Sequence, residues 1–171
     1  MTAPWKPALE HQFAAALQML ENAVRACPAP DWDDASLAVK HRFWYLTYHT
    51  LFWMDFYLSE REAGFAPPPP YTLGEFDPDG VYPDRTYAVS ELLAYLEHDR
   101  AKLRHALASL TEARAGESCG FTRRDMSVLE LHLYSLRHVQ HHAAQLNLLL
   151  RQRTDSAPRW VGSVSLGPGG S

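Results

Sequence analysis

The chain has 171 residues, 46% of them hydrophobic and 21% charged, so it can bury one substantial core and is expected to form a single domain. Its formal net charge of −4 gives no electrostatic reason to expect nucleic acid or an anionic membrane as a partner. No apolar run approaches the roughly 20 residues that cross a bilayer, and no signal-peptide pattern opens the chain, so we expect a cytoplasmic protein. Cys27 and Cys119 show no metal-site spacing and are expected to be free thiols.

Four long helical patterns follow one another along the chain. The first is predicted over about 6–26, where apolar residues recur at intervals of three and four. The second, over 34–62, contains eight aromatic residues between positions 43 and 57 and is expected to be the most buried helix. The third, over about 87–111, carries a stripe of leucines, and the fourth runs over about 126–153 with Thr122 and Asp125 as candidate N-caps.

A long connection separates the second helix from the third. It contains four consecutive prolines at 67–70, which favour extended backbone and exclude a helix. A crossover of about 25 residues is long enough for the second and third helices to run parallel. The patterns together predict an all-α four-helix bundle over residues 1–163, with 159–162 docked on it and 164–171 as a disordered tail.

Histidines are the unusual feature of this composition, nine in all, and three of them lie close together in the fourth helix. His138 and His142 are four residues apart, so both rings can lie on one helical face, which is otherwise apolar and inward. His141 is three residues from His138 and could replace His142 as its partner; spacing alone does not choose. On the second helix, His49 also shares an inward face with aromatic residues.

Three neutral imidazoles from two helices would bind a metal and leave a coordination position open, as catalytic zinc sites do. The alternative for His49 is a core histidine hydrogen-bonded to a neighbouring group. The other histidines considered, His11, His41, His98 and His105, lie on mixed or polar faces and are expected at the surface.

Further polar residues lie on the same faces or interrupt an apolar stripe. Residues that could orient the ligands or contact a substrate are Tyr45, Asp99, Arg100, Ser135 and Gln145. The alternative for Asp99 and Arg100, which interrupt the leucine stripe of the third helix, is an ion pair between helices. The alternative for the other three is that they are ordinary polar groups of the packed interior.

Several of these segments together resemble the DinB/YfiT-like family of metalloenzymes. They are Tyr48-His49-Thr50-Leu51-Phe52-Trp53-Met54-Asp55, the Glu91 to Arg100 stretch, the His138 to Leu146 segment and Arg159-Trp160-Val161-Gly162. The resemblance implies an up-down-down-up bundle and a divalent metal held by His49, His138 and His142, so it selects His142 over His141. The family often has Arg-Gly before the glutamine, where this chain has Ala143-Ala144, so that positive charge is missing here.

The ligand type favours zinc, with nickel next. At such a site a bound water could ionise near neutral pH, or a thiol could take its place as the nucleophile. The resemblance implies thiol transfer with low-molecular-weight thiols such as bacillithiol or mycothiol, or isomerisation, and nothing in the sequence selects between these reactions. It also implies association into dimers. We therefore expect a divalent-metal-dependent enzyme that performs thiol transfer or hydrolysis on a small substrate. The alternative is a non-catalytic dimer or ligand-binding bundle with a structural or vestigial metal site.

Overall fold

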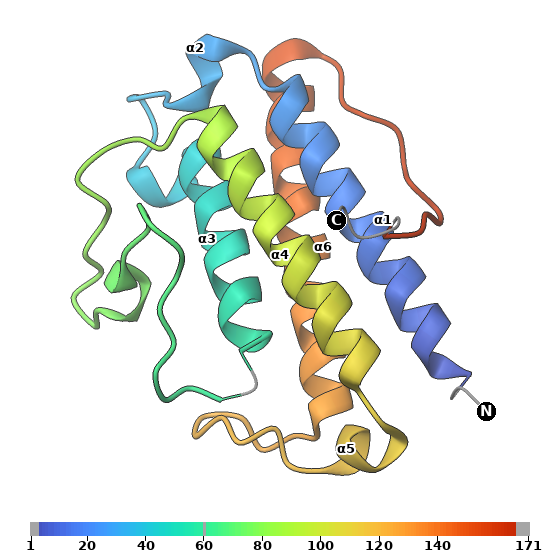
Figure 1. Ribbon diagram of the computed structural model, residues 1–171. Helices are drawn as coiled ribbons and strands as arrows, with labels where there is room; N and C mark the ends of the chain where they lie inside the picture. The colour runs from blue at the N-terminus through green and yellow to red at the C-terminus, as the bar shows by residue number, and fades with distance from the viewer. Residues whose placement is uncertain (1–3, 60, 167–171) are drawn as a thin grey trace.

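The computed structural model describes residues 4–59 and 61–166, and their regular structure is helical apart from one β-bridge between Ser118 and Ser127. Four long helices form a bundle, as predicted from the sequence (Figure 1). They are α1 (Trp5–Ala26), α3 (Phe43–Tyr57), α4 (Val89–Ser109) and α6 (Val128–Thr154). Short helices and 3-10 turns lie between them: α2 (Ala29–Trp32), η1 (Val39–His41), η2 (Leu73–Phe76) and α5 (Glu112–Gly116).

The direction of the helices follows from the long connection between α3 and α4. In Figure 1, α1 and α6 run upward while α3 and α4 both run downward, and residues 61–88 return the chain to the top. Helix α6 packs against α1 and α3, and α4 packs against the same two helices. The pairing of α3 with α6 is the one that positions the histidines.

The aromatic helix is shorter than the sequence predicted. Helix α3 covers Phe43–Tyr57 instead of 34–62. It begins later than predicted because the chain before it is held in a turn. There the Asp34 carboxylate accepts the backbone N–H of Ser36, and Arg42 has extended backbone and binds both Leu37 O and Asp33. Eleven of the 15 residues of α3 are buried, the largest share of any long helix, which confirms the predicted burial.

The start of α6 also differs from the prediction. Its N-cap is Ser127, whose hydroxyl accepts the Glu130 N–H while the Glu130 carboxylate accepts the Ser127 N–H, both at 3.2 Å. The predicted cap Thr122 instead binds Glu62 through its N–H and hydroxyl. A capping box outcompetes a lone threonine because it satisfies two backbone donors of the helix end at once.

The segment after α6 returns along the bundle. Val161 and Leu166 pack against the hydrophobic core, and Arg104 donates to the Leu166 carbonyl, whereas Trp160 is 71% exposed. The docked tail predicted at 159–162 is thus held by Val161 and not by Trp160. Of the tail predicted to be disordered, 167–171 lies outside the described residues.

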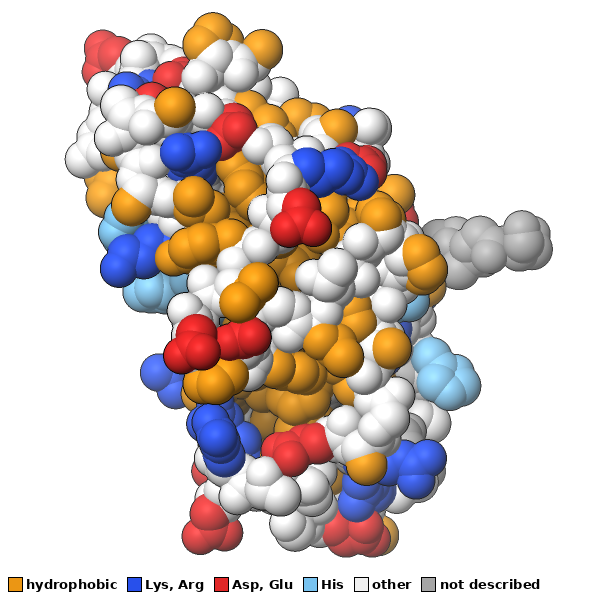
Figure 2. Space-filling model, turned by 90° about the vertical axis from the view of Figure 1, so that its left-hand side faces the viewer, with side chains coloured by type: hydrophobic (Ala, Val, Ile, Leu, Met, Phe, Trp, Pro, Cys, Tyr) orange, Lys and Arg blue, Asp and Glu red, His pale blue; other side chains and the backbone are white. Residues whose placement is uncertain are grey.

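The surface carries charges of both signs. On the face that includes the long connection, acidic and basic groups alternate with hydrophobic side chains (Figure 2). Large apolar side chains of that connection remain exposed, namely Leu73, Phe76, Val81 and Tyr82. Both cysteines are free thiols, as predicted, and no helix among the described residues combines the length and apolarity needed to span a bilayer.

Candidate metal centre

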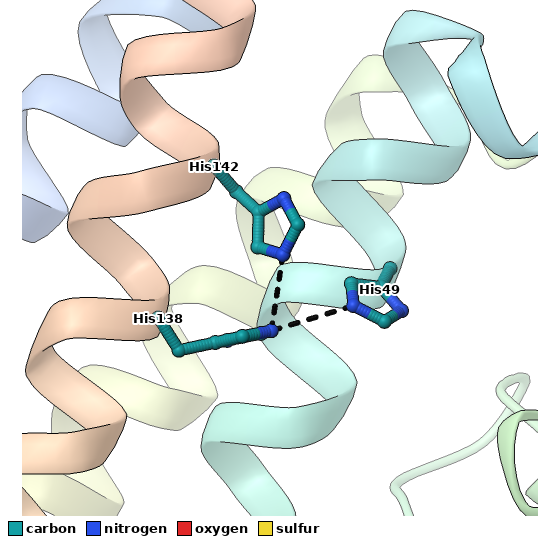
Figure 3. Close-up of side chains that lie close together, drawn as sticks. All are labelled: His49, His138 and His142. Carbon is teal, nitrogen blue, oxygen red and sulfur yellow. Dashed lines mark hydrogen bonds between the residues drawn. The ribbon is translucent and has the colours of Figure 1, made fainter.

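Three histidines from two helices converge on one point between α3 and α6 (Figure 3). The Nε2 atom of His138 lies 3.3 Å from Nε2 of His49 and 3.1 Å from Nε2 of His142. One ring nitrogen of each residue lies within 4.8 Å of the other two. These are the three residues that the sequence predicted as metal ligands.

The helices bring the rings together in two ways. His138 and His142 are one helical turn apart on α6, so their side chains project from the same face. His49 faces them from α3, which packs directly on α6. Each of the three side chains is partly buried, and 28% of the His49 side chain remains exposed to solvent.

Hydrogen bonds on the far side of two rings orient these ligands. The Nδ1 atom of His49 lies 2.7 Å from Oε2 of Glu75, a residue of the long connection. That carboxylate also accepts the Tyr45 hydroxyl at 2.5 Å and the Trp53 indole N–H at 2.8 Å. On the other helix, Nδ1 of His142 lies 2.6 Å from Oε1 of Gln145.

These contacts decide which ring nitrogen carries the proton. A carboxylate and an amide oxygen only accept hydrogen bonds, so His49 and His142 each carry a proton on Nδ1 when neutral. Their Nε2 lone pairs then point toward the centre of the cluster. This is the arrangement of metal-binding histidines, in which the outer N–H binds a carboxylate or carbonyl.

Burial keeps two of the imidazoles neutral. It lowers the pKa of His138 to about 3, with a further contribution from the neighbouring histidines. Burial also lowers the pKa of His142 to about 4. Burial alone would raise the pKa of Glu75. The hydrogen bond and charge of His49 outweigh that effect and lower the pKa of Glu75 below its usual value. The cluster thus combines two neutral imidazoles, those of His138 and His142, with the ionised carboxylate of Glu75.

The spacing of the nitrogen atoms fits a metal ion. With zinc–nitrogen bonds of 2.0–2.1 Å, two ligands of a tetrahedral site lie about 3.3 Å apart. The two distances from His138 Nε2 are 3.3 and 3.1 Å. Unlike His49 and His142, His138 has no outer partner, because its Nδ1 is buried without a hydrogen bond among the described residues. The donor set and its geometry therefore suit a divalent metal held by three imidazoles.

His141 lies beside the cluster and not in it. It is exposed, with its ring centre 5.0 Å from that of His142. It lines a surface hollow of about 520 Å³ next to the cluster, together with Tyr134, Arg137, His138, Gln140 and Ala144. His11, His41, His98 and His105 are all exposed, as predicted.

The other residues singled out from the sequence fall into two groups. Tyr45 supports the cluster by binding Glu75, the partner of His49, and Gln145 supports it by binding His142 directly. Ser135 is fully buried, and its hydroxyl has no hydrogen-bond partner among the described residues. Arg100 pairs with Glu21 of α1 and with Glu97, so it does form an ion pair between helices, although not with Asp99. Asp99 lies in a separate cluster with Asp55 and His98.

Glu75 and Trp53 were not identified from the sequence as parts of this site. Glu75 lies in the irregular connection among other acidic residues, so neither spacing nor periodicity distinguishes it. Glu75 could have been suspected only from the topology, because the connection between α3 and α4 must pass His49 and contains this carboxylate. His132 was also overlooked; it is buried on α6, its Nδ1 has no partner among the described residues, and burial lowers its pKa to about 4.

Comparison with known protein families identifies the family of this chain. A family model described as the DinB superfamily matches residues 12–146, a span that contains all three histidines and Gln145. Because this match covers most of the chain, the protein belongs to the DinB superfamily. Comparisons with curated proteins and with solved structures gave no match.

Proposed function

We propose that this protein is a divalent-metal-dependent enzyme that performs thiol transfer or hydrolysis on a small substrate. The observation that carries the proposal is the convergence of the Nε2 atoms of His49, His138 and His142. Three protein ligands on a tetrahedral ion leave a fourth position for water or substrate, which is typical of catalytic sites. When bound, the metal would act as a Lewis acid and lower the pKa of a water or thiol at that position.

The chain's own residues provide orientation and a route of approach. Glu75 and Gln145 fix the rings of His49 and His142, so little rearrangement is needed when the metal binds. The hollow lined by Arg137, His138 and His141 reaches one ligand of the cluster, and we propose that a small molecule approaches the metal from this side of α6. Arg137 would favour a substrate with an acidic group, as in a carboxylate-bearing low-molecular-weight thiol.

Ala143 and Ala144 shape this side of the site. Ala143 is completely buried, so an arginine there would have to displace core side chains. Ala144 lines the hollow, where its methyl group leaves room. We infer that the positive charge near the substrate is supplied here by Arg137. Zinc is the metal we propose, with nickel next, and we propose that the protein works as a homodimer.

Cobalt substitution would test the open position. Co²⁺ replaces zinc in histidine sites, and its visible absorption reports the number and type of ligands. We expect the Co²⁺ protein to develop a sulfur-to-cobalt charge-transfer band when cysteine is added, because a thiol would occupy the fourth position. The same titration of His138→Ala should give no such band.

A spectrum that does not respond to cysteine or to azide would contradict the proposal. It would indicate a closed site and favour a bundle with a structural metal. Metal analysis of tag-free protein provides the second measurement, since a catalytic or structural site should hold one metal per chain. No stoichiometric metal, or a metal content unchanged in His138→Ala, would also contradict the proposal.

A further inference from the structure

A second cluster of metal-ligating side chains lies between α3 and α4. It consists of Asp55 on α3 with His98 and Asp99 on α4, and one ligand atom of each lies within 4.8 Å of the others. The Nε2 atom of His98 is 3.4 Å from Oδ1 of Asp55. Along α3, Asp55 is six residues beyond His49, which is about 9 Å further along the axis and about 120° away around it. The two clusters therefore face different helices.

Asp99 is the unusual member of this cluster. Its side chain is completely buried, and neither carboxylate oxygen has a hydrogen-bond partner among the described residues. A buried polar group without a partner costs free energy, and each such group in a native protein calls for a ligand, a water or an ion. Burial, together with the nearby charge of Asp55, raises the pKa of Asp99 well above its usual value. A bound cation would give the Asp99 oxygens a partner and would offset the negative charges of the two carboxylates.

The Asp55 carboxylate already binds one cationic group, the ammonium of Lys102. The Lys102 ammonium lies 2.5 Å from Oδ1 of Asp55 and also donates to the Asp55 carbonyl and the Ser59 hydroxyl. The Tyr95 hydroxyl donates to Oδ2 of Asp55 at 3.0 Å. Lys102 donates a hydrogen bond to Asp55 but none to Asp99. The Asp99 carboxylate is therefore left without a hydrogen-bond donor among the described residues.

Solvent reaches the cluster from one side. The His98 side chain is 43% exposed and that of Lys102 is 26% exposed, whereas both carboxylates are buried. A cation could thus enter past His98, and the flexible Lys102 could withdraw from Oδ1 of Asp55 toward solvent.

We propose that Asp55, His98 and Asp99 form a second, independent site for a divalent cation that prefers oxygen ligands, of which Mn²⁺ is a representative. Two carboxylates and one imidazole suit such an ion better than the all-imidazole cluster does. Binding would bring a partner to the Asp99 oxygens, which have none among the described residues. The inference does not depend on the function proposed for the three histidines.

Mn²⁺ titration followed by electron paramagnetic resonance tests this site. The signal of free Mn²⁺ falls as the ion binds, so stoichiometry and affinity are read directly. The titration uses the full chain carrying His138→Ala and His142→Ala, which removes the first site. We expect one Mn²⁺ per chain in this background, and an affinity reduced at least about 100-fold by Asp99→Asn or by His98→Ala.

Matched variants on the same helix control for charge and folding. Glu97→Gln removes an exposed carboxylate two residues from Asp99, and His105→Ala removes another exposed histidine; neither should change Mn²⁺ binding. Lys102→Met removes the competing ammonium and should tighten binding by about tenfold. Because His98 is exposed, its replacement tests the site even if Asp99→Asn does not fold.

Three results would overturn the proposal. The first is the absence of Mn²⁺ binding in the variant that carries His138→Ala and His142→Ala. The second is binding that Asp99→Asn and His98→Ala leave unchanged. The third is binding that appears only after Lys102→Met, because the native lysine would then be the cation that this cluster holds.

Discussion

Glu75 offers a direct test of how the metal ligands are oriented. Its Oε2 accepts from His49 at 2.7 Å and from Trp53 at 2.8 Å, and its Oε1 accepts from Tyr45 at 2.5 Å. In Glu75→Gln, an amide oxygen at the Oε2 position keeps the bonds to His49 and Trp53, and the amide NH₂ can donate to the Tyr45 oxygen. This variant therefore removes the negative charge and keeps the orientation. Glu75→Leu removes both.

The two variants should weaken metal binding by different amounts. Outer hydrogen-bond partners of metal-binding histidines typically contribute 10–100-fold to metal affinity. We expect Glu75→Gln to weaken zinc binding by about tenfold, or about 1.4 kcal/mol, through the lost charge. Glu75→Leu also frees the His49 ring to rotate and protonate on either nitrogen, and it should approach about 100-fold, or about 2.7 kcal/mol.

Competition with a chromophoric chelator at pH 7.5 measures these affinities. Asp84→Asn, an exposed carboxylate in the same connection, is the matched control and should bind zinc like the unchanged protein. Thermal unfolding of the metal-free variants checks that each one folds. If Glu75→Leu binds zinc within a factor of about two of the unchanged protein, the reasoning that Glu75 orients His49 is refuted.

Three further predictions concern the ligands, the buried histidine and the cap of α6. His138→Ala should lose the metal and His141→Ala should retain it, as measured by metal analysis of tag-free protein, because only His138 belongs to the converging cluster; equal metal content in both would contradict this. The folded-state pKa of His132 is about 4, below its unfolded value of about 6.5, so its contribution to stability is complete above pH 6.5 and is lost as the pH falls toward 4. Between pH 7 and pH 4.5 the free energy of unfolding, measured by urea titration, should therefore fall by about 2–3 kcal/mol less in His132→Phe than in the unchanged protein. An unchanged pH profile would show that His132 does not resist protonation. Ser127→Ala should lower the free energy of unfolding by about 1 kcal/mol, and a larger loss in Thr122→Ala would place the cap where the sequence first suggested.

The fold was predictable where the pattern of apolar residues repeats over many turns. Three of the four long helices begin and end within about two residues of their predicted limits because their stripes are regular. The aromatic helix was predicted too long, since a helical pattern does not reveal that Asp33, Asp34 and Arg42 hold the preceding segment in a turn. Local hydrogen bonds to side chains overrode the periodicity there.

The metal cluster was predictable in part. The spacing of His138 and His142 indicates a shared face whatever the rest of the fold, because helix geometry alone determines it. The choice of His142 over His141 required the family resemblance, and the structure agrees with that choice because His141 is exposed. Glu75 could not be found from spacing, since its position depends on the path of an irregular connection.

The sequence by itself determined which long helices form, which of their faces turn inward and which histidines share a face, because these properties depend on periodicity along one helix. Only the tertiary structure decided which residues meet across helices. Packing of α3 on α6 brings His49 to His138, and packing of α3 on α4 brings Asp55 to the unpartnered Asp99. The path of the long connection places Glu75 behind His49. These meetings depend on distances between segments far apart in the chain, and no local pattern specifies such distances.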